Sequence, residues 1–290
     1  MKIYLGCIPC FARQAVEAAE MATNDHKIRE KIVREALKVA SVIPFDKTPP
    51  HMGKEIHRII RKTVGNNIDP YKSLKDKYNK KAMKIYPEMK EIVKKSKNPL
   101  ETAVRITIAG NIIDFGITTT DSIIHLMDIV NETLNRPFAI NHFASFEKDL
   151  QKAKKILYLA DNAGEIVFDR ILIEEIPDYK ERITLAVKGH PIINDATLED
   201  AKQTGLTQLV RVIENGSDAP GTILEECSED FRKEVKSADL LISKGQGNYE
   251  TLSETSYNVY FLLKAKCPVI AGDLGVNVGD IVIKKGNYNG

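Results

Sequence analysis

The sequence predicts an α/β fold in two parts, an N-terminal all-helical half followed by a mostly parallel sheet with helices around it. Two observations lead to this prediction. Segments with helical periodicity dominate residues 1–150, whereas short apolar runs alternate with helix-compatible stretches from 151 to 290. Such alternation is typical of right-handed βαβ units. We therefore expect a helical bundle domain over 1–150 and a sheet domain over 151–290.

The first half carries apolar residues at helical spacing in successive segments. In the clearest of these, Ile28, Ile32 and Ala36 share one face, and Pro44 follows the end of the segment. Pro87 is expected to interrupt a long Lys-rich helix, because proline removes a backbone donor and clashes with the preceding turn. The expected helices cover residues 11–21, 27–42, 51–64, 69–95, 99–111 and 120–134.

The second half changes from helical periodicity to short apolar runs. These runs predict strands at 155–161, 183–188, 209–213, 240–244 and 259–263, and a run at 280–284 is expected to close an edge of the sheet. The stretches between them predict helices at 165–175, 197–204, 220–235 and 249–255. Parallel strands joined by such helices require right-handed crossovers.

Composition excludes several classes of protein. The 42 basic and 40 acidic residues nearly cancel to a net charge of +2, so no global charge favours nucleic acid or an anionic membrane. No apolar run reaches the roughly 18 to 20 residues that span a bilayer. The first residues lack the apolar core of a signal peptide. We expect a cytoplasmic protein without a nucleic-acid or membrane partner, and the sequence indicates no oligomeric state.

Cysteines do not form a disulfide framework in this sequence. Cys7 and Cys10 form a C-x-x-C pair ahead of a predicted helix, whereas Cys227 and Cys267 each stand alone. The pair is consistent with a redox couple, half of a metal site, or packed thiols near a cleft. These three interpretations remain open.

Polar residues gather where the predicted strands end. Asp161 and Asn162 follow the first strand, and Asp195 lies in the segment after the second. Ligands of open α/β sheets bind outside the carboxyl ends of the strands, so these side chains should meet at one edge. Carboxylate and amide oxygens suit a hard or borderline divalent cation. The sequence thus predicts a metal site made of these three residues, although each motif alone is also typical of turns and helix caps.

Basic and small residues at the same edge suggest an anion site. Lys188 and Lys244 end two predicted strands, Gly245 follows the second lysine, and Ser217 lies in the loop after the third strand. Lysines are point charges that suit phosphate, and glycine lets backbone N–H groups approach an anion. A cation with lysines beside it would stabilise charge on a transferring phosphoryl group. Taken singly, lysines at strand ends are more often merely solvated.

Other candidates are weaker on spacing alone. Asn111 and Asp114 lie one helical turn apart and face the same way, which is equally consistent with a structural role. His190 lies in a promising loop but is a single histidine. His51 and His57 are badly spaced for two ligands on one helix, so we expect no metal there.

Together these motifs resemble those of the damage-control phosphatases, a metal-dependent family once described as a domain of unknown function. The resemblance runs from the cysteine pair to Asp273-Leu-Gly275, and the opening is similar to the cysteine-bearing, mainly archaeal subfamily. The motifs that carry it are Cys7-Ile-Pro-Cys10, Gly110-Asn111 with Asp114, Asp161-Asn162-Ala-Gly-Glu165, Asn194-Asp195 and Ser243-Lys244-Gly245.

The resemblance implies a helical domain packed on a three-layer αβα, Rossmann-like domain. It also implies manganese, nickel, cobalt or magnesium at Asp161, Asn162 and Asp195, and hydrolysis of phosphate monoesters such as sugar phosphates or damaged phosphometabolites. By the same likeness Lys244 would hold the phosphate, and Asn111 and Asp114 would reach the site from the helices. A metal-activated water is favoured as the nucleophile, with attack by Asp161 as the alternative.

Two other functions compete with phosphate ester hydrolysis. An αβα layout suits methyl transfer from S-adenosylmethionine, but the turn from Asp161 to Glu165 has one glycine, and the G-x-G-x-x-G and P-loop patterns are absent. A non-catalytic phosphometabolite-binding protein, or a thiol and metal binding module using Cys7 and Cys10, is the other alternative.

Overall fold

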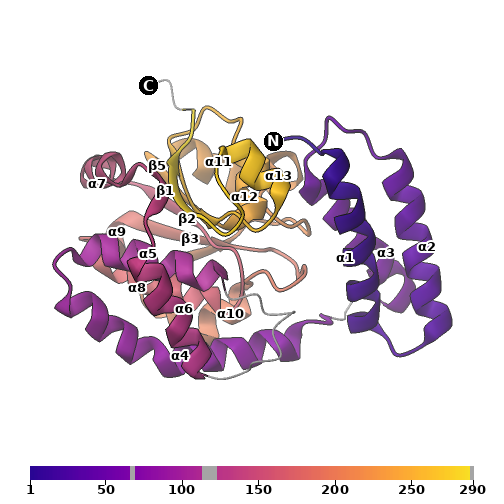
Figure 1. Ribbon diagram of the computed structural model, residues 1–290, viewed down its shortest axis with the longest axis horizontal. Coiled ribbons are helices and arrows are strands. Elements are labelled where there is room, and N and C mark those ends of the chain that lie inside the picture. The colour runs from indigo at the N-terminus through magenta and orange to yellow at the C-terminus, as the bar shows by residue number, and fades with distance from the viewer. Residues whose placement is uncertain (66–68, 113–122, 288–290) are drawn as a thin grey trace.

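The computed structural model describes residues 1–65, 69–112 and 123–287, and it confirms the predicted α/β fold. An N-terminal helical region precedes a seven-stranded, mostly parallel sheet interleaved with helices (Figure 1). Within the described residues, no helix combines the length and the apolarity needed to cross a bilayer. Asp114 of the predicted site lies outside the described residues.

The first three long helices form a lobe with its own apolar core. They are α1 (Ile8–Ala22), α2 (His26–Val42) and α3 (Pro49–Val64), preceded by the 3₁₀ turn η1 (Leu5–Cys7). Apolar side chains of all three helices, among them Phe11, Ile32 and Met52, make this core. In Figure 1 the lobe lies to one side of the sheet.

A second group of helices packs against one face of the sheet. It comprises α4 (Lys72–Lys95), α5 (Pro99–Ile112), α6 (Ile123–Asn135), α7 (Phe143–Lys152) and α8 (Glu165–Glu175). The expected interruption at Pro87 is wrong, because α4 continues through it. Pro87 is exposed, whereas Ile85, Met89 and Val93 bury the opposite face, so apolar packing outweighs the missing hydrogen bond.

The sheet has the strand order β1-β7-β6-β5-β2-β3-β4. Its strands are β1 (Phe138–Asn141), β2 (Ile156–Leu159), β3 (Ile183–Val187), β4 (Arg211–Glu214), β5 (Leu240–Lys244), β6 (Val259–Lys264) and β7 (Ile281–Lys285). All neighbours pair in parallel except β6 and β7. The expectation that 280–284 closes an edge is wrong, since β1, which periodicity did not predict, covers β7.

The opposite face carries α11 (Glu229–Ser237), α12 (Gly245–Leu252) and α13 (Pro268–Leu274), whose apolar side chains pack on the sheet. The remaining short elements are α9 (Tyr179–Arg182), α10 (Leu198–Gln203), η2 (Leu206–Gln208) and η3 (Leu224–Glu226). The expected helix 220–235 begins only at Glu229, where the side chain of Ser228 caps it. The preceding segment is therefore free to form a loop at the carboxyl edge of the sheet.

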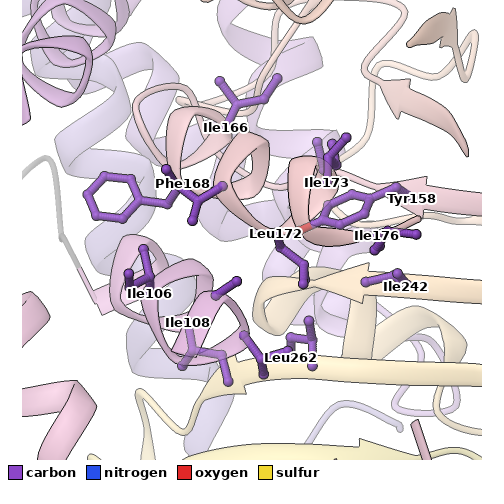
Figure 2. Packing of buried hydrophobic residues seen from close by; sticks show 14 of the residues in the cluster. Ile106, Ile108, Tyr158, Ile166, Phe168, Leu172, Ile173, Ile176, Ile242 and Leu262 are labelled. Carbon is purple, nitrogen blue, oxygen red and sulfur yellow. The ribbon is translucent and has the colours of Figure 1, made fainter. Parts of the chain in front are cut away.

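α5 and α8 cross closely above the centre of the sheet. Figure 2 shows Ile106 and Ile108 of α5 near Phe168 and Leu172 of α8. Gly110 permits this approach, because a Cβ there would lie 2.9 Å from the Phe168 side chain. The crossing places the end of α5 beside the start of α8, at the edge of the sheet where β2 and β5 end.

Gly110→Ala is expected to lower the free energy of unfolding by about 1–3 kcal/mol, since the added methyl group forces the two helices apart. Gly272→Ala is the matched control, because a Cβ at Gly272 meets nothing within 4 Å. That substitution should be neutral or stabilising by up to about 1 kcal/mol, through helix propensity. Urea denaturation of both variants measures the difference, and equal stabilities would contradict the close packing of α5 on α8.

Candidate active site

The loop after β2 turns sharply into α8 at the carboxyl edge of the sheet. β2 is buried throughout, Asp161 and Asn162 follow it with partial exposure, and Gly164 adopts a φ of +76° before Glu165 begins α8. Asn79 of α4 fixes this turn by accepting a hydrogen bond of 2.7 Å from the Gly164 backbone N–H. The turn therefore presents Asp161 and Asn162 to solvent from a rigid support.

The loop after β3 folds back onto the loop after β2. Asn162 and Asp195 form an antiparallel bridge, and the Ala196 N–H donates to the Asp161 carbonyl at 2.8 Å. A second bond of the same length runs from the Ala163 N–H to the Asn194 carbonyl. These backbone bonds bring Asp161, Asn162 and Asp195 together from segments that are more than thirty residues apart.

Four carboxylates, which we call the acidic cluster, gather beneath this edge: Asp161, Glu165, Asp169 and Asp195. Glu165 and Asp169 lie on α8 with fully buried side chains. Lys244 at the end of β5 donates hydrogen bonds of 2.7 Å to each of them and a third, of 3.0 Å, to the Thr107 carbonyl. Lys244 is itself fully buried, and all three of its N–H donors are engaged.

Two hydroxyl groups complete the buried network around Lys244. The Thr107 hydroxyl and the Tyr158 hydroxyl donate to Asp169 Oδ1 at 2.5 and 2.8 Å. Sequence reasoning predicted Lys244 as a phosphate ligand, and the structure places its ammonium group against Glu165 and Asp169 instead of at the open edge. The residues of this network come from α5, β2, α8 and β5.

Two amide side chains bridge the acidic cluster. Asn111 Nδ2 donates to Asp161 Oδ2 at 3.0 Å and to Glu165 Oε2 at 3.1 Å. Asn162 Nδ2 donates to the same two oxygens at 2.9 and 3.0 Å. The structure thus brings Asn111 of α5 to the predicted metal residues.

Lys188 at the end of β3 is buried beside Asp195. Its Nζ lies 3.3 Å from Asp195 Oδ2 and donates to the Gly221 carbonyl. The geometry to Asp195 Oδ2 is not that of a hydrogen bond, and this buried oxygen has no hydrogen-bond partner among the described residues. Buried carboxylate oxygens are normally satisfied, so this oxygen is a ready acceptor for a further ligand.

Gly245 and Ser217 determine the backbone conformation around the site. Gly245 has a φ of +78°, and a Cβ at this position would overlap the Asp161 carboxylate. The Ser217 hydroxyl is buried and accepts a hydrogen bond of 3.1 Å from the Ala219 N–H. Gly245 therefore allows α12 to begin against Asp161, whereas Ser217 stabilises its own loop.

Helix α3 holds the loop at 215–228 through ion pairs, which we call the α3 clamp. Arg58 donates to both oxygens of Asp218 at 2.9 and 2.7 Å, and Arg61 pairs with the same carboxylate. Lys54 pairs with Glu226 at 2.8 Å. Burial opposes ionisation of Asp218, but Arg58 and Arg61 outweigh it and lower the pKa of this carboxylate. The clamp joins the helical lobe to the loop that contacts Lys188.

Charge in the acidic cluster is not balanced by its lysines. Burial and the neighbouring Glu165 and Asp195 raise the pKa of Asp161 well above its ordinary value. Burial also raises the pKa of Asp195, and Lys188 opposes this. Lys244 contacts Glu165 and Asp169, and Lys188 contacts Asp195, so among the described residues two ammonium groups are in contact with a cluster of four carboxyl groups. A divalent cation would supply the missing positive charge.

The residues at this edge fit a divalent metal. Asp161, Asn162 and Asp195 offer hard oxygen donors, and Asp195 Oδ2 lacks a hydrogen bond. Among the described residues no three or more His, Cys, Asp or Glu side chains form a ready metal cluster. The predicted metal site is not a group of this type, because Asp161 and Asp195 supply two carboxylates and Asn162 supplies an amide. The four cysteines are free thiols.

Sequence reasoning missed Glu165, Asp169, Thr107 and Tyr158 as site residues. Glu165 could have been predicted as a site residue, because it lies three residues after Asn162 and begins a predicted helix. Asp169 follows by one further turn on the same face of α8. Nothing in the sequence pairs Thr107 or Tyr158 with them, since these contacts depend on the crossing of α5 and α8.

Fold and site together define a class: α/β proteins with a carboxylate and amide site, suited to a divalent metal, at the carboxyl edge of a mostly parallel sheet. The model of the damage-control phosphatase ARMT1-like domain family matches residues 3–282. The chain therefore belongs to the damage-control phosphatase ARMT1-like domain family, as the motifs predicted.

Relatives cover nearly the whole chain. An uncharacterized protein of Methanocaldococcus jannaschii is 44% identical over 98% of this chain and 96% of its own length. A damage-control phosphatase of Archaeoglobus fulgidus is 37% identical over 98% of this chain and 99% of its own. The crystal structure of a DUF89 family protein from Pyrococcus horikoshii matches with a TM-score of 0.89 at 37% identity, covering 99% of both chains.

Proposed function

We propose that the protein is a metal-dependent phosphatase that hydrolyses phosphate monoesters of small metabolites. The observation that carries this proposal is the backbone bridge that brings Asp161 and Asn162 to Asp195 beside an excess of negative charge. Family membership supports the same activity, since relatives are named damage-control phosphatases. Sugar phosphates and damaged phosphometabolites are the substrate classes we favour.

Asp161, Asn162 and Asp195 would hold the metal, with manganese, nickel, cobalt or magnesium as the candidates. When bound, such a cation acts as a Lewis acid on a phosphoryl oxygen and lowers the pKa of a bound water. Their partial exposure leaves Asp161 and Asn162 accessible to a ligand from solvent.

The other residues of the site have positioning roles in this proposal. Glu165 accepts hydrogen bonds from Asn111 and Asn162 and thereby orients both amides, while Lys244 holds the opposite oxygen of Glu165. Lys188 keeps Asp195 beside the loop at 215–228. We therefore propose that Lys244 is a positioning residue, which acts on the metal residues through its contact with Glu165.

Water is the nucleophile we favour over Asp161. Asp161 Oδ2 already accepts two amide hydrogen bonds, which fix this carboxylate and reduce its nucleophilicity. In-line attack needs a nucleophile aligned opposite the leaving group, and a water at the open edge could be held in that position. Asn111 is placed to orient the groups at the edge rather than to react.

Release of phosphate from p-nitrophenyl phosphate tests the proposed function. We expect release with Mn²⁺ or Mg²⁺ and its loss on addition of a chelator, with recovery when the metal is restored. Ester binding without release would instead indicate a non-catalytic phosphometabolite-binding protein. Binding of S-adenosylmethionine without any effect of the metal would favour a methyltransferase, and either result would contradict the proposal.

A further inference from the structure

The cysteine pair at the start of α1 has no part in the proposed metal site. Cys7 ends η1 and is the N-cap residue of α1, and Cys10 lies in the first turn of that helix. Both residues carry free thiols. Cys7 has helical backbone angles, with a φ of −79° and a ψ of −25°. Residues three apart in such a backbone lie on one face of the helix, so the two side chains are neighbours.

The two thiols of the pair differ in their access to solvent. Cys10 is exposed, and Arg13 Nη2 donates to its sulfur at 3.8 Å. Cys7 is 7% exposed and packs in the apolar core of the helical lobe. Burial raises the pKa of the Cys7 thiol, and a negative charge on Cys10 would raise it further. Since the thiolate is the reactive form of cysteine, Cys10 is the residue that meets an oxidant first.

The other two cysteines are held by separate parts of the fold. Cys227 is buried, and its S–H group donates to the Ile223 carbonyl at 3.3 Å. Cys267 is the N-cap residue of α13, and its sulfur accepts from Gln246 Nε2 at 3.8 Å. The charge of Cys267 influences the Cys7 thiol, so this third sulfur lies in the same region. It belongs to another segment of the chain, whereas Cys7 and Cys10 stay close together because two residues join them.

The pair lies where η1 packs on the sheet half of the chain. A Cβ at Gly6 would lie 3.1 Å from the Val269 side chain, so η1 is in close contact with the first turn of α13. Cβ atoms of residues three apart on a helix are about 5–6 Å from each other, and a disulfide needs about 3.5–4.5 Å. A local adjustment of the first turn of α1 is therefore enough to join the two sulfurs.

We propose that Cys7 and Cys10 form a reversible disulfide when the protein meets a peroxide, as a thiol redox site separate from the metal residues. The Cys10 sulfur attacks one peroxide oxygen and gains a hydroxyl group, the O–O bond breaks, and the other oxygen leaves as water with the Cys10 proton. The Cys7 sulfur then attacks the Cys10 sulfur. The S–S bond forms, the S–O bond breaks, and the hydroxyl group leaves as water with the Cys7 proton. Two thiols thus supply the two electrons that reduce one peroxide, and exchange with a dithiol reverses the oxidation.

Thiol counting and peptide mapping after exposure to hydrogen peroxide test the inference. Free thiols should fall from four to two, and dithiothreitol should restore all four. Trypsin cleaves after Lys2 and Arg13, so both cysteines of the pair lie in one peptide, 3–13. After the remaining thiols are blocked with N-ethylmaleimide, mass spectrometry should find this peptide unblocked and lighter by two hydrogen atoms.

Three variants assign the role of each sulfur. Cys10→Ser changes an exposed residue and should lose the disulfide, with its three thiols left intact. Cys7→Ala should stop at the sulfenic acid of Cys10, which dimedone labels. Cys267→Ser is the matched control, because serine is a favourable N-cap residue, and it should form the disulfide as the unaltered protein does.

The outcomes are independent of phosphate release, so this inference and the proposed function can fail separately. A disulfide that contains Cys267, or loss of the disulfide in Cys267→Ser, would overturn the pairing of Cys7 with Cys10. Four free thiols after peroxide treatment, or oxidation of Cys10 to a sulfinic acid without any disulfide, would overturn the redox site altogether.

Discussion

Asp161→Ala is expected to abolish metal-stimulated phosphate release while the protein stays folded. Asp161 contributes a carboxylate to the proposed metal site and accepts the amide hydrogen bonds of Asn111 and Asn162. Losing several kcal/mol of transition-state stabilisation corresponds to a fall in kcat of roughly 10³-fold or more. Phosphate release at saturating metal measures the fall, and circular dichroism checks the fold.

Asp230→Ala is the matched control, because this aspartate is almost fully exposed on α11. It removes the same charge from the chain and should leave turnover and metal binding unchanged. Removing Asp161 also relieves repulsion in the acidic cluster, so stability should not fall as activity does. Near-normal turnover in Asp161→Ala would refute the assignment of the site.

Lys244→Met should cause the largest loss of stability of any single substitution in the site. The methionine leaves Glu165 and Asp169 buried without their cation, and breaking a buried ion pair from one side costs about 3–5 kcal/mol. Urea denaturation measures this change in the free energy of unfolding. Activity should fall as well, because Glu165 no longer holds Asn111 and Asn162 in place.

A triple variant separates charge from packing at Lys244. Adding Glu165→Gln and Asp169→Asn to Lys244→Met removes the unpaired charges, so part of the lost stability should return while activity stays low. Lys236→Met on the surface should change stability by no more than about 0.5 kcal/mol. Full stability of Lys244→Met would mean that the buried network around it contributes nothing.

The order of strands and helices could be predicted because the apolar runs after residue 155 are short and buried. β1 escaped prediction, since its four residues alternate between partial and full exposure and resemble a loop. The position of β7 could not be predicted either. Whether a strand lies at an edge depends on which other strand pairs with it, and β1 and β7 are far apart along the chain.

Residue types at the strand ends indicated the site, but not how each side chain is used. Asp161, Asn162 and Asp195 followed strands whose parallel order places their ends together, so their proximity was predictable. The environment of Lys244 was not, because Thr107 and Asp169 reach it through the crossing of α5 over α8.

The α3 clamp has a consequence for dissecting this protein. Arg58, Arg61 and Lys54 neutralise carboxylates on a loop that belongs to the other half of the chain. A truncated protein that begins after α3 would leave Asp218 and Glu226 without these cations, and the loop that anchors Lys188 would lose its outer support. Attempts to isolate the sheet region for crystallisation or binding assays should therefore retain the first three helices.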